Sequence, residues 1–226
     1  MIYITGDTHG NFDRLTSLSL REGQNLTKND YLIILGDFGL LWENIQSAYE
    51  ADLIHALNLL PFTTLFIDGN HENFKRLEML EEIELFGNKV GKISNSIYHL
   101  KRGNVYTIED KTFFCFGGGI SIDKHLRLEF ISWWSQEMPN HKEMAKGIQS
   151  LRKNNWEVDY VLTHDAPADL YPDLNMPFTM KNNLSEYLNL IKVKANFKKW
   201  HFGHFHDNKL FDNKYQLLYD EIILLK

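Results

Sequence analysis

The feature that most constrains this fold is a set of five short polar clusters, each placed where an apolar run of the chain ends. Three clusters lie in the first third of the chain, and two lie after residue 160. They are Gly6-Asp7-Thr8-His9-Gly10, Gly36-Asp37-Phe38-Gly39, Gly69-Asn70-His71-Glu72, Thr163-His164-Asp165 and Gly203-His204-Phe205-His206. The carboxyl ends of strands in an open α/β sheet converge on one crevice, where ligand sites gather. We therefore expect the five clusters to meet in space.

Helical patterns separate the apolar runs that carry these clusters. Short continuous apolar runs between turn residues are typical of buried strands, and a spacing of three to four residues is typical of helices. We predict strands at residues 2–5, 31–35, 64–67, 158–163 and 199–202, and helices after Asn11, at 45–60, around 74–80, at 141–153 and at 184–193. Asn11 is expected to cap the first helix, and Pro61 to stop the second.

The middle and the end of the chain have a different, strand-rich pattern. Residues 96–99, 104–108 and 112–116 are short β-rich pieces separated by turn residues, which predicts antiparallel hairpins. The last such pieces, at 209–211, 216–219 and 221–225, predict a closing meander. Strands that alternate with helices, together with hairpins, indicate an α/β sandwich of two mixed sheets flanked by helices.

Composition favours a single domain of residues 1–226. The chain is 43% hydrophobic, which is enough for one core, and it has no internal repeat or linker-like stretch. The only cysteine, Cys115, excludes an internal disulfide and is expected to pack in a buried strand. No apolar run is long enough to cross a bilayer, and the N-terminus has no secretory pattern. We therefore expect a cytoplasmic protein without a membrane partner.

The formal net charge of −6 argues against broad binding of nucleic acid. Such binding usually needs a basic surface, and no dense block of Lys and Arg occurs in the chain. An acidic protein still binds an anionic substrate where bound cations supply positive charge. The ten histidines are more informative, because several of them fall in the Gly-bracketed clusters.

Asp, His and Asn side chains suit divalent ions of manganese, iron, zinc or nickel. Alternate side chains of an extended segment point the same way, so Asp7 and His9 are expected to face one ion together. The same argument applies to the pair His204 and His206. A single carboxylate has two oxygens, so Asp37 is placed to bridge two ions.

Taken in order, the five clusters resemble the motif set of the calcineurin-like metallophosphoesterases, over most of the chain. This resemblance implies the two-sheet fold of that family and two divalent metal ions, with manganese expected. It assigns Asp7, His9 and His206 to the first ion, Asp37 to a bridging position, and Asn70, His164 and His204 to the second ion. His71 is implied to be no ligand but the group that protonates the leaving oxygen or stabilises its charge.

The resemblance implies hydrolysis of phosphate monoesters or diesters by a metal-bound water or hydroxide, and it implies no covalent phosphoenzyme. The expected substrate is a phosphorylated small molecule or a nucleotide. Leu40 and Leu41 stand where many protein phosphatases of this family carry an Asp and an Arg, which weakens a protein phosphatase reading. Glu43 or Glu72 is then expected to orient His71, and Arg127 or Lys124 to grip the phosphate.

Two other functions remain as alternatives, a metal-dependent nuclease and a catalytically silent scaffold of the same fold. The missing basic groove argues against the first, and the complete ligand set argues against the second. For several other residues, a structural role is at least as well supported as a functional one. His201 is expected in the core, His55 and His99 in structural or solvated positions, and His141 on the surface. Trp133 and Trp134 are expected to pack in the core rather than to stack on a substrate. Asp165 and Asp169 are expected either to hydrogen-bond a metal-ligating histidine or to serve in turns and caps.

Overall fold

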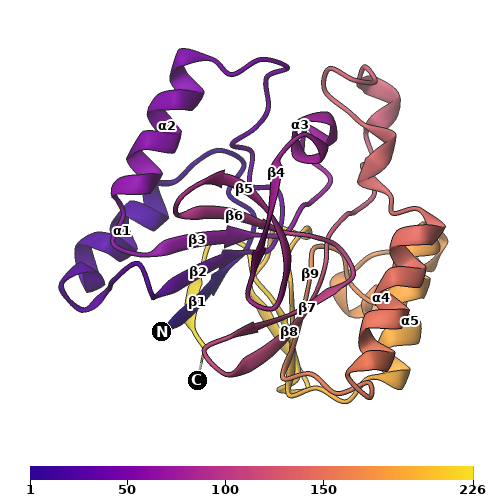
Figure 1. Cartoon of the computed structure of the whole chain (residues 1–226). Coiled ribbons are helices and arrows are strands. Elements are labelled where there is room, and N and C mark those ends of the chain that lie inside the picture. Colours follow the sequence, from indigo (N-terminus) through magenta and orange to yellow (C-terminus); the bar gives the residue numbers. More distant parts are fainter. Residues whose placement is uncertain (226) are drawn as a thin grey trace.

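The computed structural model describes residues 1–225, apart from the side chains of Gln24 and Phe178, and it contains two mixed β-sheets flanked by helices (Figure 1). The seven-stranded sheet has the order β13 (Ile222–Leu224), β1 (Ile2–Thr5), β2 (Tyr31–Ile34), β3 (Thr63–Phe66), β6 (Ile97–Leu100), β5 (Asn88–Ser94), β4 (Glu81–Leu85). The six-stranded sheet has the order β11 (Lys209–Phe211), β12 (Tyr215–Leu217), β10 (Lys199–Phe202), β9 (Tyr160–Thr163), β8 (Lys111–Phe116), β7 (Asn104–Ile108). The predicted sandwich of two mixed sheets is confirmed.

The core is layered because side chains alternate between the two faces of each strand. In β1, Ile2 and Ile4 join a buried cluster that contains residues of both sheets, whereas Tyr3 joins the cluster on the opposite face. In β8, Cys115 belongs to the shared cluster and Phe114 to the face that the C-terminal helices cover. The apolar strands are therefore buried on both faces, as their continuous apolar runs predict.

Helices cover the two outer faces. Figure 1 shows α1 (Asp13–Glu22) and α2 (Ala48–Leu59) on one flank, and α4 (His141–Lys153) and α5 (Asn183–Lys194) on the other. The start of α4 agrees with its prediction, because Asn140 and Glu143 form a capping box there. The short α3 (Phe74–Glu78) follows the third polar cluster. No helix in the described part of the chain is long and apolar enough to cross a membrane.

Two helix starts differ from the prediction. The helix α1 begins at Asp13 with Phe12 as its cap residue, and Asn11 instead accepts a hydrogen bond of 3.0 Å from the Asp13 N–H in the turn before it. The helix α2 begins three residues later than predicted, because the Ser47 side chain accepts from the Glu50 N–H and fixes the start. Ile45, which fits the helical spacing, is 82% exposed outside the helix.

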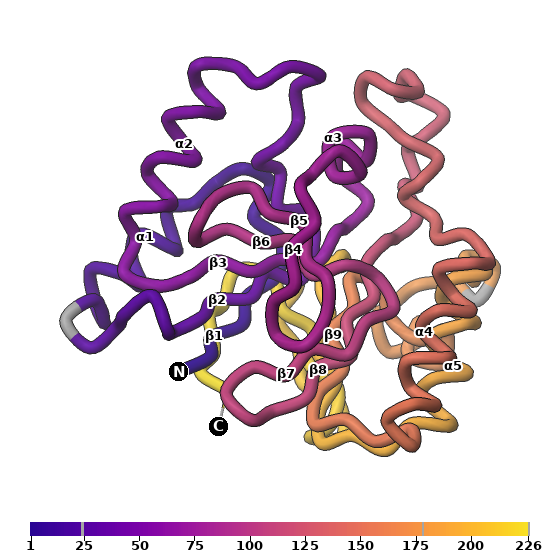
Figure 2. The backbone as a smooth tube through the Cα atoms, viewed as in Figure 1, coloured from indigo at the N-terminus to yellow at the C-terminus, as the bar shows by residue number. Residues whose placement is uncertain are grey.

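Strand pairing tests the predictions for the hairpins and the meander. Of the middle pieces, β7 and β8 form an antiparallel hairpin as predicted, and β6 pairs antiparallel with β5, but it does so in the other sheet, where β3 runs parallel to it on the other side. The closing meander is wrong, because β11 and β12 pair in the six-stranded sheet while β13 crosses over and pairs antiparallel with β1. Figure 2 shows the two ends of the chain close together for this reason. Crossing over lets β13 cover an edge that β1 would otherwise expose.

The sequence prediction missed the hairpin of β4 and β5. Its first strand carries three glutamates in five residues and is largely exposed, so it lacks the apolar run that marks a buried strand. Its turn residues, Phe86 and Gly87, have φ angles of 57° and 79°. Two positive φ angles in a two-residue loop are typical of the tight turns that join twisted antiparallel strands.

Candidate metal centre

The five polar clusters meet at one edge of the sandwich. Strands β1, β2 and β3 run parallel, so their carboxyl ends place Asp7, Asp37 and Asn70 side by side. Strands β9 and β10 are parallel neighbours in the other sheet and carry His164 and His204 at the same edge. The two sheets meet here, since Nε2 of His164 lies 3.5 Å from Oδ1 of Asp37.

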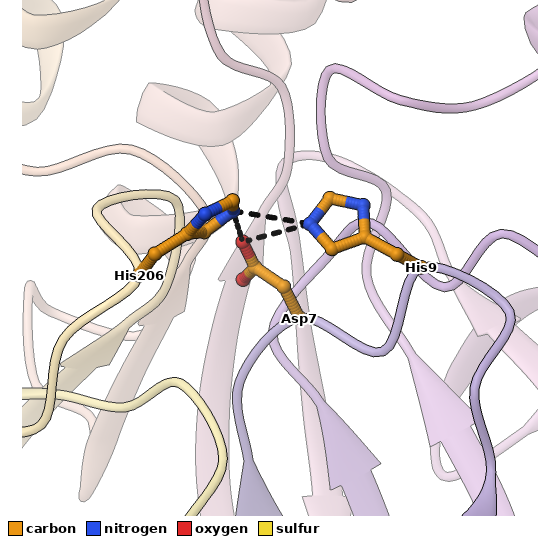
Figure 3. A group of neighbouring side chains, drawn as sticks. All are labelled: Asp7, His9 and His206. Carbon is orange, nitrogen blue, oxygen red and sulfur yellow. Dashed lines mark hydrogen bonds and ion pairs between the residues drawn. The ribbon is translucent and has the colours of Figure 1, made fainter.

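The first group of potential ligands consists of Asp7, His9 and His206 (Figure 3). One ligand atom from each lies within 4.8 Å of the others. Nε2 of His206 is 3.2 Å from Oδ2 of Asp7, and Nε2 of His9 is 3.8 Å from the same oxygen. The two imidazole nitrogens are 3.0 Å apart. The side chains come from opposite ends of the chain and converge on one point.

A second group adjoins the first and shares Asp7 with it. Asp7, Asp37 and His164 also offer ligand atoms within 4.8 Å of one another, and all three are buried. Oδ1 of Asn70 lies 3.0 Å from Nε2 of His164, and the ring of His204 lies 4.9 Å from that of His164. Oδ2 of Asp37 is 3.8 Å from Nε2 of His9, so the Asp37 carboxylate faces both groups.

Four of the potential ligands have left-handed rather than extended backbone, and this conformation sets the direction of their side chains. The φ angles of His9, Asp37, His204 and His206 are 46°, 49°, 72° and 49°. The expectation that His204 and His206 face one ion together assumed an extended segment. That assumption is wrong, because both residues have left-handed backbone. His206 lies with Asp7 and His9, whereas the ring of His204 packs against His164. Left-handed conformations of non-glycine residues cluster at functional sites, where the surrounding structure holds them.

Two glycines allow the carboxylates to lie where they do. A Cβ atom on Gly69 would overlap Oδ1 of Asp37, and a Cβ atom on Gly203 would overlap Oδ1 of Asp7. The same carboxylate oxygens accept backbone hydrogen bonds, from His71 N–H at 2.7 Å and from His204 N–H at 3.1 Å. The loops therefore fix the carboxylates as well as make room for them.

The glycine-rich loop of residues 117–119 lies beside the same centre. A Cβ atom on Gly119 would be 3.4 Å from both Oδ1 of Asn70 and Cε1 of His204. Close approach of backbone to a crowded site is a usual reason for glycine. The segment that follows this loop is thereby directed along the rim of the centre.

Further hydrogen bonds orient the ligands from behind. The amide of Asn70 donates to Oγ of Ser121 at 3.0 Å, and that hydroxyl donates to the carboxylate of the buried Glu137 at 2.5 Å. This leaves Oδ1 of Asn70 facing the site. Nδ1 of His164 donates to the carbonyl of Leu35 at 2.7 Å, which leaves its Nε2 toward the carboxylates. Such outer partners fix the orientation and tautomer of ligand side chains.

Sequence reasoning missed three residues that brace this site. Ser121 and Glu137 carry no motif of their own, and a buried serine or glutamate is recognised only once its partner is known. Arg14 donates to the backbone carbonyls of Gly6, Asp7 and Tyr219, which ties the first ligand loop to the last part of the chain. An isolated arginine in a helix pattern gives no signal of such a contact.

Electrostatics differ between the two buried carboxylates. Burial raises the pKa of Asp37, and the neighbouring Asp7 carboxylate adds to this effect. Burial also acts to raise the pKa of Asp7, but His164, His206 and the backbone N–H of His204 outweigh it and lower that pKa. Desolvation, with His164 close by, lowers the pKa of His204 to about 3. A neutral imidazole beside an ionised carboxylate is the form that binds a metal.

His71 lies beside the ligand groups with Arg127 at its back. Nη1 of Arg127 is 3.1 Å from Nδ1 of His71, and both carboxylate oxygens of Asp123 hold the guanidinium at 2.8 Å. Burial, with the positive charge of Arg127, lowers the pKa of His71 although Asp37 acts against this. The ammonium of Lys124 points elsewhere, 5.9 Å from the centre of the Trp133 ring.

Among the described contacts, neither of the two glutamates expected to orient His71 meets its ring. Glu72 is buried and accepts the Phe38 N–H at 2.8 Å, so it braces the loop of the second cluster instead. Burial and the Asp37 carboxylate raise the pKa of Glu72 well above its usual value. Glu43 is exposed, and its backbone carbonyl accepts from Arg76. Among the described contacts, Arg127 is the side chain that meets Nδ1 of His71.

The remaining singled-out residues have structural positions. His201 is buried in β10, and His55 and His141 are exposed, in line with their predictions. His99 is buried and lies 3.0 Å from Asp68, which is also paired with Arg102. Trp134 is buried in the core, and Trp133 is half-buried. The carboxylate of Asp165 accepts a hydrogen bond from the Tyr171 hydroxyl, whereas Asp169 is exposed near Lys192.

The donor set fits divalent metal ions. Oδ2 of Asp7 is buried and accepts no hydrogen bond, although Nε2 of His206 lies 3.2 Å away. A buried carboxylate oxygen without a donor costs free energy unless a cation balances it. Imidazole nitrogens, carboxylate oxygens and an amide oxygen surround this point, and they are the ligand types of borderline divalent metals.

Comparison with known proteins agrees with this geometry. A search of curated proteins finds no match to the chain. The sequence model of the calcineurin-like phosphoesterases, by contrast, matches residues 1–212, a span that contains all five polar clusters. With nearly the whole length of 226 residues matched, the chain belongs to the calcineurin-like phosphoesterase family.

Proposed function

We propose that this protein hydrolyses phosphate monoesters or diesters at a centre of two divalent metal ions. The observation that carries the proposal is the pair of adjoining ligand groups, which share Asp7 and are both faced by the Asp37 carboxylate. Asp7, His9 and His206 would hold one ion, and Asn70, His164 and His204 the other, with Asp37 between them. Two ions side by side are suited to clamp both the attacking and the leaving oxygen of a phosphoryl group.

Divalent ions bound there would lower the pKa of water and polarise the phosphoryl oxygens. The protein's own part begins with position, since backbone N–H groups hold both carboxylates in place. His71 lies next to the ligands and would donate a hydrogen bond from Nε2 to the leaving oxygen, which stabilises the negative charge that develops there. Arg127 supports this role, because a guanidinium has only donors and so requires Nδ1 of His71 to accept, which leaves the imidazole proton on Nε2.

Several finer features belong to the same proposal. Manganese is the expected metal, with iron, zinc or nickel as alternatives of the same ligand preference. The substrate is a phosphorylated small molecule or a nucleotide, and residues 1–226 act as one domain. A cytoplasmic location is supported by the free, buried Cys115, which suits a reducing compartment.

The test is to measure metal content and hydrolysis together. Purified protein loaded with manganese should bind two ions and hydrolyse an aryl phosphate or a bis-aryl phosphodiester. Asp37→Asn should lower metal occupancy and abolish turnover, whereas Asp169→Asn, on an exposed acid near Lys192, should change neither. Protein that binds no metal and hydrolyses no ester would overturn the proposal and favour a scaffold. Strong, salt-dependent cleavage of oligonucleotides would favour a nuclease.

A further inference from the structure

A cavity of about 350 Å³ opens beside the metal centre, and its two walls differ in character. One wall is the centre itself, with Asp37, Asn70 and three histidines. The other wall is built from five apolar side chains, Ile120, Ile122, Leu174, Met176 and Phe205. Ligand pockets in proteins span about 300–1,000 Å³, so this cavity suits a small molecule.

Segments that lie far apart in the sequence supply the apolar wall. Ile120 and Ile122 come from the segment between β8 and α4, which projects above the sheets in Figure 1. Leu174 and Met176 come from the segment between β9 and α5, and Phe205 from the loop after β10. The last three also pack on the core that α4 and α5 cover, so their positions are held before any ligand arrives. The part of the wall formed by Leu174, Met176 and Phe205 is therefore preorganised.

Ile122 stands out because it is 66% exposed and belongs to none of the hydrophobic core clusters. An apolar side chain at the mouth of a cavity gains free energy when a ligand covers it, at about 25 cal/mol per Å² of buried surface. Ile122 lies at the rim of the metal centre, so the alcohol part of a phosphate ester bound there would lie against it.

The charges at the cavity point to the same kind of ligand. No lysine or arginine is among the described residues that line it, whereas two carboxylates, of Asp37 and Asp123, are. Arg127 is near, but both carboxylate oxygens of Asp123 already engage its guanidinium. A second phosphate on the substrate would thus find no lysine or arginine among the described lining residues to balance it.

We propose that the substrate is an ester of a single phosphate whose alcohol part is apolar and uncharged, aromatic or branched aliphatic, and packs against Ile122 and Met176. This inference rests on the proposed hydrolysis at the metal centre and names its substrate class. The metal centre takes the phosphoryl group, and the apolar wall takes the alcohol. Polyphosphates and nucleic acid are disfavoured by the same arrangement of charge.

The test compares 1-naphthyl phosphate with phenyl phosphate, since the two alcohols have similar acidity and differ mainly in apolar surface. For the wild type, kcat/KM should be about 10-fold higher for the naphthyl ester. Ile122→Ser and Met176→Ser should each bring that ratio toward one. Leu126→Ser is the matched control, because Leu126 is 79% exposed on the same segment and does not line the cavity. Its ratio should stay that of the wild type.

A binding measurement separates this inference from the proposed activity. Calorimetry with a non-hydrolysable naphthylmethylphosphonate on the manganese-loaded protein should show about 10-fold weaker binding in Ile122→Ser and unchanged binding in Leu126→Ser. Equal ratios and affinities in all variants would overturn the substrate class, as would a higher kcat/KM for nucleoside triphosphates than for the naphthyl ester. If no ester is hydrolysed but the phosphonate binds through Ile122, the pocket stands and the hydrolytic function fails.

Discussion

The guanidinium of Arg127 lies 3.1 Å from Nδ1 of His71 and donates two hydrogen bonds to the Asp123 carboxylate, which hold it in place. Arginine has only N–H donors, so the imidazole nitrogen that faces it must accept. His71 is thereby kept in the tautomer that carries its proton on Nε2. In this chain a cation, and not the expected glutamate, orients His71 so that its Nε2–H is free to donate a hydrogen bond.

Removing Arg127 should therefore slow the reaction without releasing the metals. We expect Arg127→Ala to lower kcat about 100-fold, the size of effect that follows loss of one donor to a developing negative charge, while metal content stays that of the wild type. Nitrogen NMR of the labelled imidazole should show a mixture of tautomers in this variant. Unchanged kcat together with a single Nε2–H tautomer would mean that Arg127 does not position His71.

The chain from Asn70 through Ser121 to Glu137 predicts an effect on metal affinity. Glu137→Gln replaces a carboxylate that accepts the Ser121 hydroxyl and backbone N–H, which frees the Asn70 amide to rotate. Loss of such outer partners usually weakens metal binding about 10- to 100-fold. Calorimetric titration with manganese measures the change, and Glu84→Gln, at an exposed position of β4, is the control. Wild-type affinity in Glu137→Gln would contradict the proposed positioning.

Close packing at Gly203 predicts a specific intolerance of any side chain. Gly203→Ala would press its Cβ against Oδ1 of Asp7 and should lower both metal occupancy and the melting temperature. Gly23→Ala serves as the control, since the nearest atoms to its added Cβ are 3.7 and 3.8 Å away. We expect the control to keep both properties. A Gly203→Ala protein with two bound ions and an unchanged melting temperature would show that the Asp7 loop can shift.

His201 predicts a dependence of stability on pH that is separate from the metal centre. Burial lowers its pKa from 6.5 to about 3, and neither ring nitrogen has a hydrogen-bond partner. Between those two pH values the unfolded chain binds the proton and the folded chain does not, so stability falls as pH falls. By linkage, this residue alone should lower the free energy of unfolding by about 2 kcal/mol at pH 5 relative to pH 8.

Replacing His201 by Leu should remove that part of the dependence. Urea unfolding of the metal-free protein at pH 8 and pH 5 gives the free energy of unfolding of both proteins. The loss between the two pH values should be about 2 kcal/mol smaller in His201→Leu. His55→Leu, at an exposed position, should lose as much as the wild type. A His201→Leu protein with the same loss would mean that His201 becomes protonated in the folded state.

The sequence predicted the sandwich and the meeting of the five clusters, because buried strands and their Gly-bracketed ends have strong local patterns. Strands 104–108, 199–202 and 209–211 and the helix at 141–153 agree with the structure residue for residue. The exposed hairpin of β4 and β5 was missed, because alternate glutamates hide a strand that buries little. The partner sheet of β13 was also missed, because pairing across 200 residues leaves no local pattern.

Within the site, residue types were predictable but their orientations were not. Asp7, Asp37 and Asn70 follow from parallel strands that end at one edge. The separation of His204 from His206 depends on two left-handed residues, a conformation that the spacing does not reveal. The role of Arg127 beside His71 depends on a loop that returns over 56 residues, which no motif records.

The pairing of β13 with β1 means that the edge of the seven-stranded sheet can be covered only after β13 has been synthesised. Until Leu224 has left the ribosome, β1 is an open edge of the nascent sheet, and an open edge invites association with other chains. Arg14 and Gly6 also contact the segment around Leu218 and Tyr219, which is translated shortly before. The loop that bears Asp7 is thus fastened only after these segments and β13 have been made, although its own residues are among the first of the chain to be translated.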